Sequence, residues 1–386
     1  MPRPAVRLAA GTLALVLPLA AAAGCGTQKK RTIKAELASA QTNLENSKAA
    51  AFTLRFDDAK GAVAALIAKD DSAPDKDLVN ALLGGSVTYV VDPVSDKKLK
   101  DLSMSQGTSS TDLSKALEDV NVAFVIRDDT STLGEVRLVD GTLYARVDLT
   151  EIGRLAKEGG VADFDAQVDS FIADAGPQFE AGLKDARAGK WLKLPLKSYL
   201  KQFQDLAKGF TGATPAPATG SLDAAKLGTD LFSAVKPYIK VTDAGDDASN
   251  RLLDVKVQAR PALKAALAIL KADKTLPFAS ALTDVTPADI DKQVAAGDAH
   301  GTITLKSGHL TQFTVDVESI RKLAPDPGKD SVAGSSVVFD IDDSADAVSV
   351  PTDVSTFDVG ALLDDFLKNL GTSVSDSSSG DGSYSG

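Results

Sequence analysis

A run of alternating apolar and polar residues, interrupted by Asp140-Gly141, is the feature that most restricts how this chain folds. Asp-Gly between two such runs favours a two-residue β-hairpin turn, because both turn residues take positive φ. This register predicts two apolar cross-strand pairs, Leu138 with Leu143 and Val136 with Ala145. The other face then carries Glu135, Arg137, Tyr144 and Arg146. We therefore expect an antiparallel sheet with one apolar face and one wet face.

The same reasoning on periodicity gives the other elements. Period-two alternation predicts strands over 51–57, 86–91, 120–127, 189–196 and 251–258, and a last pair over 335–340 and 347–350. Helical patterns cover 33–48, 59–69, 75–83, 150–187, 197–210, 221–238, 261–274 and 359–370, and Thr286 suits the N-cap of a further short helix. The order of elements predicts an α+β domain, with helices packed against an antiparallel sheet.

A second hairpin is expected within residues 301–317. A two-residue turn would place Ile303 opposite Gln312. A three-residue loop with Gly308 in the left-handed conformation instead places Ile303 opposite Phe313 and keeps the apolar side chains on one face. We therefore predict the three-residue loop.

The N-terminus has the pattern of an export signal. Arg3 and Arg7 precede an uncharged stretch from Leu8 to Gly24, which is too short for a membrane-spanning helix and is typical of a signal peptide over residues 1–24. Ala23 and Gly24 precede Cys25, the single cysteine of the chain, and this resembles the lipobox of bacterial lipoproteins. The resemblance implies cleavage before Cys25 and lipidation of its sulfur. Residues 25–34 would then form a lipidated tether on the extracytoplasmic face of the cell membrane.

Charge narrows the range of partners. Loss of Arg3 and Arg7 on cleavage lowers the net charge from −11 to about −13, which argues against nucleic acid as a partner. One domain is expected over 35–370, with a Pro/Ala/Thr-rich linker at 211–220 inside it. The Ser-, Gly- and Asp-rich tail at 371–386 is expected to be disordered.

The residues that enzymes need are not grouped in the sequence. His300 and His309 are the two histidines, each beside a glycine, and no nucleophile or phosphate-loop motif appears. Acidic clusters at 243–247 and 340–343 do not match a calcium-binding loop. We therefore expect no enzyme, no metal site and no cofactor. Trp191, the single tryptophan, is compatible with a sugar platform, a cavity wall or core packing.

Three short segments resemble landmarks of a known family. They are Val139-Asp140-Gly141-Thr142-Leu143-Tyr144, Lys190-Trp191 and Val348-Ser349-Val350-Pro351. In this order they resemble the actinobacterial cell-envelope lipoproteins of the LppX and LprG group, which are related in fold to the carrier LolA. The resemblance implies a curved antiparallel half-barrel, helices on its concave face and a cavity for acyl chains. The chain is longer than typical members, with extra helical segments near 150–187 and 262–298.

Two functions follow as expectations. The first is a membrane-anchored protein that binds or carries a lipid or lipoglycan, and the second is a surface module that binds or senses a protein partner. The expected cavity residues are Phe52, Leu54, Phe56, Val122, Phe124, Val136, Leu138, Leu143, Trp191, Ile303 and Phe313. A cavity with an open mouth would favour the first function, and a filled core with an exposed apolar patch would favour the second.

We expect Cys25→Ala to abolish incorporation of a fatty-acid probe, because the variant lacks the sulfur that accepts the lipid. Metabolic labelling followed by in-gel detection measures this, with Thr27→Ala as a labelled control. The Cys25→Ala protein should also remain uncleaved or leave the membrane. Label persisting on this variant would contradict the assignment of Cys25.

Overall fold

The computed structural model describes residues 32–58, 61–67, 79, 83–102, 119–158, 163–174, 177–194, 224–247, 249–273 and 282–356. Several expectations lie outside these residues: the signal peptide, Cys25, most of the tether, most of the 75–83 helix, the 197–210 helix, the 211–220 linker, the 359–370 helix and the tail.

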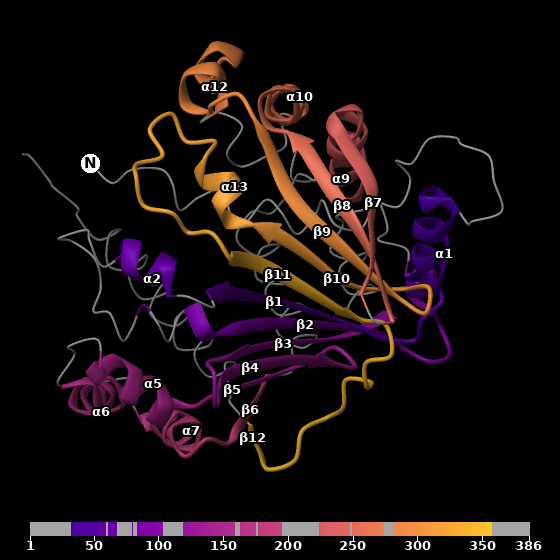
Figure 1. Ribbon diagram of the computed structural model, residues 1–386. Coiled ribbons are helices and arrows are strands. Elements are labelled where there is room, and N and C mark those ends of the chain that lie inside the picture. Colours follow the sequence, from indigo (N-terminus) through magenta and orange to yellow (C-terminus); the bar gives the residue numbers. More distant parts are fainter. Residues whose placement is uncertain are drawn as a thin grey trace, which may run out of the picture.

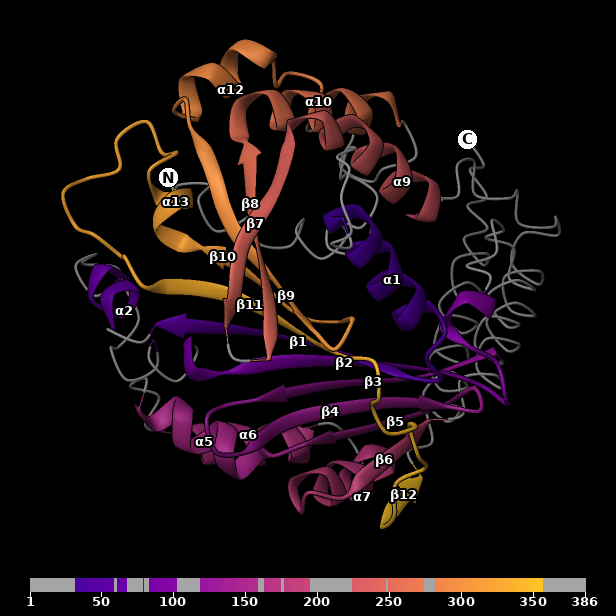
Figure 2. The same ribbon diagram turned by 45° about the vertical axis from the view of Figure 1, so that its right-hand side comes forward.

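One unclosed sheet of twelve strands organises the described chain, and helices accompany it in a mixed α+β architecture. Its order is β12-β6-β5-β4-β3-β2-β1-β11-β10-β9-β8-β7, and the pairs are antiparallel except β12 with β6. The bounds are β1 Ala50–Asp58, β2 Ser86–Pro93, β3 Val120–Arg127, β4 Thr132–Val139, β5 Thr142–Val147, β6 Trp191–Leu194, β7 Ile239–Asp247, β8 Asn250–Gln258, β9 Asp298–Lys306, β10 His309–Asp316, β11 Ser335–Asp342 and β12 Val354–Thr356. Figures 1 and 2 show the strand direction turning strongly from β7 and β8 to β4 and β5.

The described α-helices are α1 Ile33–Glu45, α2 Ala62–Ile67, α5 Leu149–Glu158, α6 Phe164–Asp174, α7 Pro177–Arg187, α9 Ala224–Val235, α10 Ala259–Ala272, α12 Pro287–Gln293 and α13 Val317–Arg321. All of them except α13 overlap segments that were predicted to be helical. The expected helical stretch 150–187 is thus divided into three helices. Thr286 caps α12 as predicted: its hydroxyl accepts from the Asp289 amide, and the Asp289 carboxylate accepts from the Thr286 amide.

The first hairpin forms in the predicted register. Asp140 and Gly141 have φ of 50° and 71°, and Val139 pairs with Thr142 across a two-residue turn. The pairs Leu138–Leu143 and Val136–Ala145 are both present.

In the second hairpin the predicted pairing is right and the predicted loop is wrong. Ile303 does pair with Phe313. However, Ser307 and Gly308 form a two-residue turn with φ of 53° and 82°, and Lys306 pairs with His309. A bulge between Leu310 and Gln312 supplies the extra residue and restores the apolar register.

The two edges of the sheet differ from the prediction. Strand β7 was not expected, because its second half is the acidic cluster of Asp243 to Asp247. The predicted strand at 347–350 is absent, since these residues have no strand conformation. The chain instead continues to β12, which pairs in parallel with β6. Val317 is not in a strand but is the first residue of α13.

The two faces of the sheet are covered by different parts of the chain. We call the face that carries Phe124 and Ile303 the apolar face, and the other the opposite face. On the apolar face, Leu37 and Ala40 of α1 pack against Leu253, Val255, Ile303 and Leu305 of β8 and β9. On the opposite face, residues 343–353, which we call the crossing segment, run from β11 to β12 (Figure 1). Their Val348 packs against Ala123, Val139, Tyr144 and Trp191.

The expectation of a wet face on the first hairpin is therefore wrong. Glu135 is 8% exposed and Tyr144 is 5% exposed, because the crossing segment and its Val348 cover this side. The apolar partner Val136 is 38% exposed. At this end of the sheet, the more polar face is the more deeply buried one.

We expect Gly141→Val to lower the free energy of unfolding by about 1 kcal/mol or more, because a β-branched residue resists positive φ. Gly134→Val is the matched control: Gly134 lies in β4, and an added Cβ there meets only the Arg146 carbonyl oxygen at 3.7 Å. Chemical denaturation of both variants measures the difference. Equal effects at the two positions would argue against the strain at Gly141.

Candidate ligand surface on the apolar face

A row of apolar side chains crosses five adjacent strands on the apolar face. Phe52 pairs with Tyr89, Tyr89 with Phe124, Phe124 with Val136, and Val136 with Ala145. Side chains directly opposite one another in adjacent strands are about 5 Å apart at Cβ, so the row is continuous. Tyr89, Phe124 and Val136 are 37%, 40% and 38% exposed. Large apolar groups are thus accessible in the middle of a sheet.

Neighbouring rows extend this surface. Leu54 pairs with Val87 and Val87 with Ile126, and beyond Ile126 lie Gly134 and the exposed Val147. A third row lies on the same face, on the other flank of the central row. It consists of the half-buried Val91, Val122, Leu138 and Leu143. We call these three rows of β1 to β5 the apolar surface. Single exposed apolar residues are ordinary, but a contiguous group marks a site of interaction.

Seven of the eleven expected cavity residues lie in these three rows: Phe52, Leu54, Val122, Phe124, Val136, Leu138 and Leu143. Phe56 points to the same face of β1, but it pairs with Val337 of β11 and lies outside the three rows. Ile303 and Phe313 share the face but lie further along the sheet, where α1 covers them. Both belong to the cluster around Leu37 and Leu253, and Phe313 also lies 6.1 Å from Phe339 between ring centroids.

Trp191 does not join them, because it lies on the opposite face. Ala145 pairs with Leu192 and Tyr144 with Lys193, so Trp191 points to the same side as Tyr144. It is 6% exposed and packs beneath Val348 of the crossing segment. Of the three roles considered for Trp191, core packing is the one that the structure shows.

A charged cluster surrounds the Trp191 ring. The guanidinium groups of Arg137 and Arg146 lie 4.9 and 5.0 Å from its centroid, an arrangement that favours cation–π attraction. Glu135 accepts from Arg137 Nε at 2.7 Å and from Arg146 Nη2 at 3.3 Å. Arg137 also donates to the carbonyl oxygen of Ser349. The cluster thus ties the crossing segment to the sheet.

Three exposed members of the surface were not among the expected cavity residues: Tyr89, Ile126 and Val147. Ile126 and Val147 each lie an even number of positions from an expected cavity residue of the same strand. Tyr89 pairs with Phe52 and Phe124, so its side chain points to the same face. The period-two pattern could therefore have identified all three. Their exposure could not be inferred, because it depends on which face the crossing segment and α1 cover.

The described residues hold no group of three or more His, Cys, Asp or Glu side chains arranged to bind a metal. The two acidic clusters engage cations of the protein: Asp243 and Asp246 bind Arg251, and Asp340 binds Arg55 at 2.8 Å. His309 Nδ1 lies 2.5 Å from Asp343 Oδ2. Every helix in the described ranges is too short or too polar to span a bilayer.

Comparison with known proteins gives no family. No family model matches the sequence, and no curated protein matches it. Among solved structures, the lipoprotein LppX of Mycobacterium tuberculosis aligns over 82% of this chain and 97% of its own, with 9% identity and a TM-score of 0.28. This identity and this TM-score are too low to show a shared fold or function.

We expect Glu135→Gln to lower the free energy of unfolding by about 1–3 kcal/mol, because it leaves two partly buried guanidinium groups without their carboxylate. Glu180→Gln is the control, since Glu180 pairs with Lys184 on the surface of α7 and such pairs contribute about 0.5 kcal/mol or less. Denaturation followed by Trp191 emission reports both. If the two variants lost equal stability, Glu135 would behave as a solvated residue.

Proposed function

We propose that this chain is an extracytoplasmic protein, lipid-anchored at the cell membrane through Cys25, which binds a lipid-like ligand on the apolar surface. It acts as a binder or carrier and performs no catalytic step. The observation that carries the proposal is the row Phe52–Tyr89–Phe124–Val136–Ala145, whose three central members are each more than a third exposed.

The length and chemistry of this row suit an acyl chain. Five strands spaced about 4.8 Å apart give a row close to 20 Å long. Within it the only polar atom of a side chain is the phenol oxygen of Tyr89. Burying this apolar area from water is favourable at about 25 cal/mol per Å². A ligand that is long, narrow and apolar covers the row without leaving polar groups unpaired.

Tyr89 lies near the centre of this row. Burial among its neighbours raises the pKa of its phenol above the ordinary value of 10, although the residue is 37% exposed. The row is narrow and suits a small ligand, whereas a protein partner needs a broad surface.

The first experiment asks whether the chain binds acyl ligands. The full chain carrying Cys25→Ser would be purified from a related bacterial host and examined by native mass spectrometry for a bound lipid. It would then be titrated with a dansyl-labelled fatty acid. We expect co-purified lipid or a saturable rise in dansyl emission. A clean mass without uptake of the labelled acid would contradict the proposal and favour a protein partner.

The second experiment locates the site. We expect Phe124→Asp to weaken binding of the labelled acid at least about tenfold, equivalent to 1.4 kcal/mol, because it places a charge in the apolar row. Phe171→Asp on α6 is the matched control, since Phe171 is 65% exposed and lies off the sheet. Trp191 emission checks that both variants fold. Equal weakening in the two variants would place the ligand elsewhere.

A further inference from the structure

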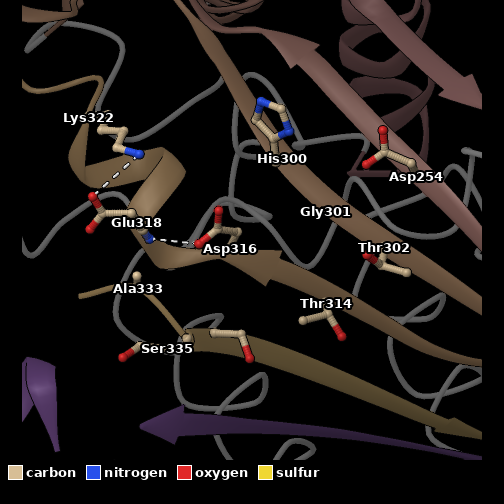
Figure 3. A pocket seen from close by; sticks show the side chains of 12 residues that line it. Asp254, His300, Gly301, Thr302, Thr314, Asp316, Glu318, Lys322, Ala333 and Ser335 are labelled. Atoms are coloured by element: carbon tan, nitrogen blue, oxygen red, sulfur yellow. Dashed lines mark hydrogen bonds and ion pairs between the residues drawn. The ribbon is translucent and has the colours of Figure 1, made fainter. Parts of the chain in front are cut away.

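A polar pocket of about 530 Å³ lies over β8 to β10, on the opposite face of the sheet and at the far end from the crossing segment. Figure 3 shows the side chains that line it. Its floor is the cross-strand row of Asp254, Thr302 and Thr314 from β8, β9 and β10. His300 and Asp316 line it further along these strands, and Glu318 and Lys322 of the α13 region and residues 333–336 form its walls. Pockets of this volume are typical of small-molecule sites.

The polar groups of the floor form a regular grid. Neighbouring strands place side chains about 5 Å apart, and successive residues on one face of a strand are about 7 Å apart. The hydroxyl groups of Thr302 and Thr314, the carboxylates of Asp254 and Asp316 and the imidazole of His300 occupy this grid. Groups spaced in this way can form hydrogen bonds to different hydroxyl groups of one small polar ligand.

Several of these groups keep hydrogen-bonding capacity. The Thr302 hydroxyl and the His300 ring have no hydrogen-bond partner within the described ranges, whereas the backbone of His300 donates to Ser319 Oγ. Asp316 accepts the Glu318 amide through Oδ1 at 2.9 Å, which leaves its second oxygen to accept further bonds. The pocket therefore offers both donors and acceptors to a ligand.

Cations of the protein pair with two of the three carboxylates around the pocket, those of Glu318 and Asp254. Glu318 accepts from Arg321 Nη2 at 2.7 Å and Nε at 2.9 Å and from the Val332 amide at 2.8 Å, and Arg321 holds the pKa of this carboxyl at about 2. Lys322 Nζ lies 3.6 Å from Glu318, and Lys256 Nζ lies 3.7 Å from Asp254. An ionic ligand would have to compete with these pairs, whereas a neutral polar ligand would not.

We propose that this pocket binds a small neutral carbohydrate, either a free monosaccharide or one unit of a glycan. Carboxylates accept hydrogen bonds from vicinal hydroxyl groups, and imidazole and threonine hydroxyl groups both donate and accept. The site lies on the opposite side of the sheet from the apolar surface. It shares no residue with the apolar surface.

The two histidines of the chain provide an internal comparison. His300 lines the pocket, and His309 lies beside Asp343 at the β9–β10 turn. Their imidazole NMR signals, assigned with His300→Gln and His309→Gln, would be followed during titration with glucose, mannose, galactose and arabinose and with their methyl glycosides, to about 50 mM, which covers millimolar Kd. We expect a saturable shift of the His300 signal with at least one of these sugars and an unchanged His309 signal. Binding of a methyl glycoside as tightly as its free sugar would identify a glycan unit, because the anomeric oxygen can then carry a substituent. Binding of the free sugar alone would identify a monosaccharide.

Variants test the floor of the pocket. We expect Thr302→Val and Asp254→Asn each to raise the Kd of the sugar at least about tenfold, because each removes or weakens a hydrogen bond to a ligand hydroxyl group. Thr42→Val on α1 should leave the affinity unchanged. The proposal would be overturned by the absence of a saturable His300 shift with every sugar, or by an undiminished shift in Thr302→Val. A shift produced by the diamine putrescine and by none of the sugars would also overturn it, in favour of a cation site.

Discussion

Strand alternation in one continuous sheet is the constraint on which the rest of this structure depends. Each residue of the twelve strands belongs to one of two faces, and each face must be covered wherever it is apolar. Helix α1 covers the apolar face at β8 and β9, and the crossing segment covers the opposite face at β3 to β6. The two covers lie at different ends and on different sides. This arrangement leaves apolar side chains accessible at one end and a polar pocket at the other.

Much of the sheet could be predicted from local sequence. The bounds of β3 and the register of the first hairpin follow from alternation and from Asp140-Gly141, because positive φ at both positions leaves few other turns. The pairing of Ile303 with Phe313 was predicted for an incorrect reason. Apolar periodicity fixed the pairing, while the chain supplied the extra residue through a bulge in β10 rather than through the loop.

The predictions are wrong where packing between distant parts of the sequence determines which side chains are buried. Hydrophobicity alone suggests that Leu138 and Val136 are buried and that Glu135 is wet. The crossing segment reverses this order by placing Val348 over Tyr144 and by accepting a hydrogen bond from Arg137. The face of Trp191 likewise depends on how the short strand β6 pairs with β5. The polar pocket brings together Asp254, His300 and Ser336 from three distant parts of the sequence, and no motif joins them.

The two ends of the sheet carry features that limit self-association. At one end, the outer half of β7 is irregular, with a bulge between Asp243 and Gly245 and exposed Asp246 and Asp247. At the other end, β12 is only three residues long. Short strands, bulges and charges at a sheet edge prevent another chain from adding as the next strand. An open sheet of this size therefore offers little regular edge to which a second copy of the chain could add a strand.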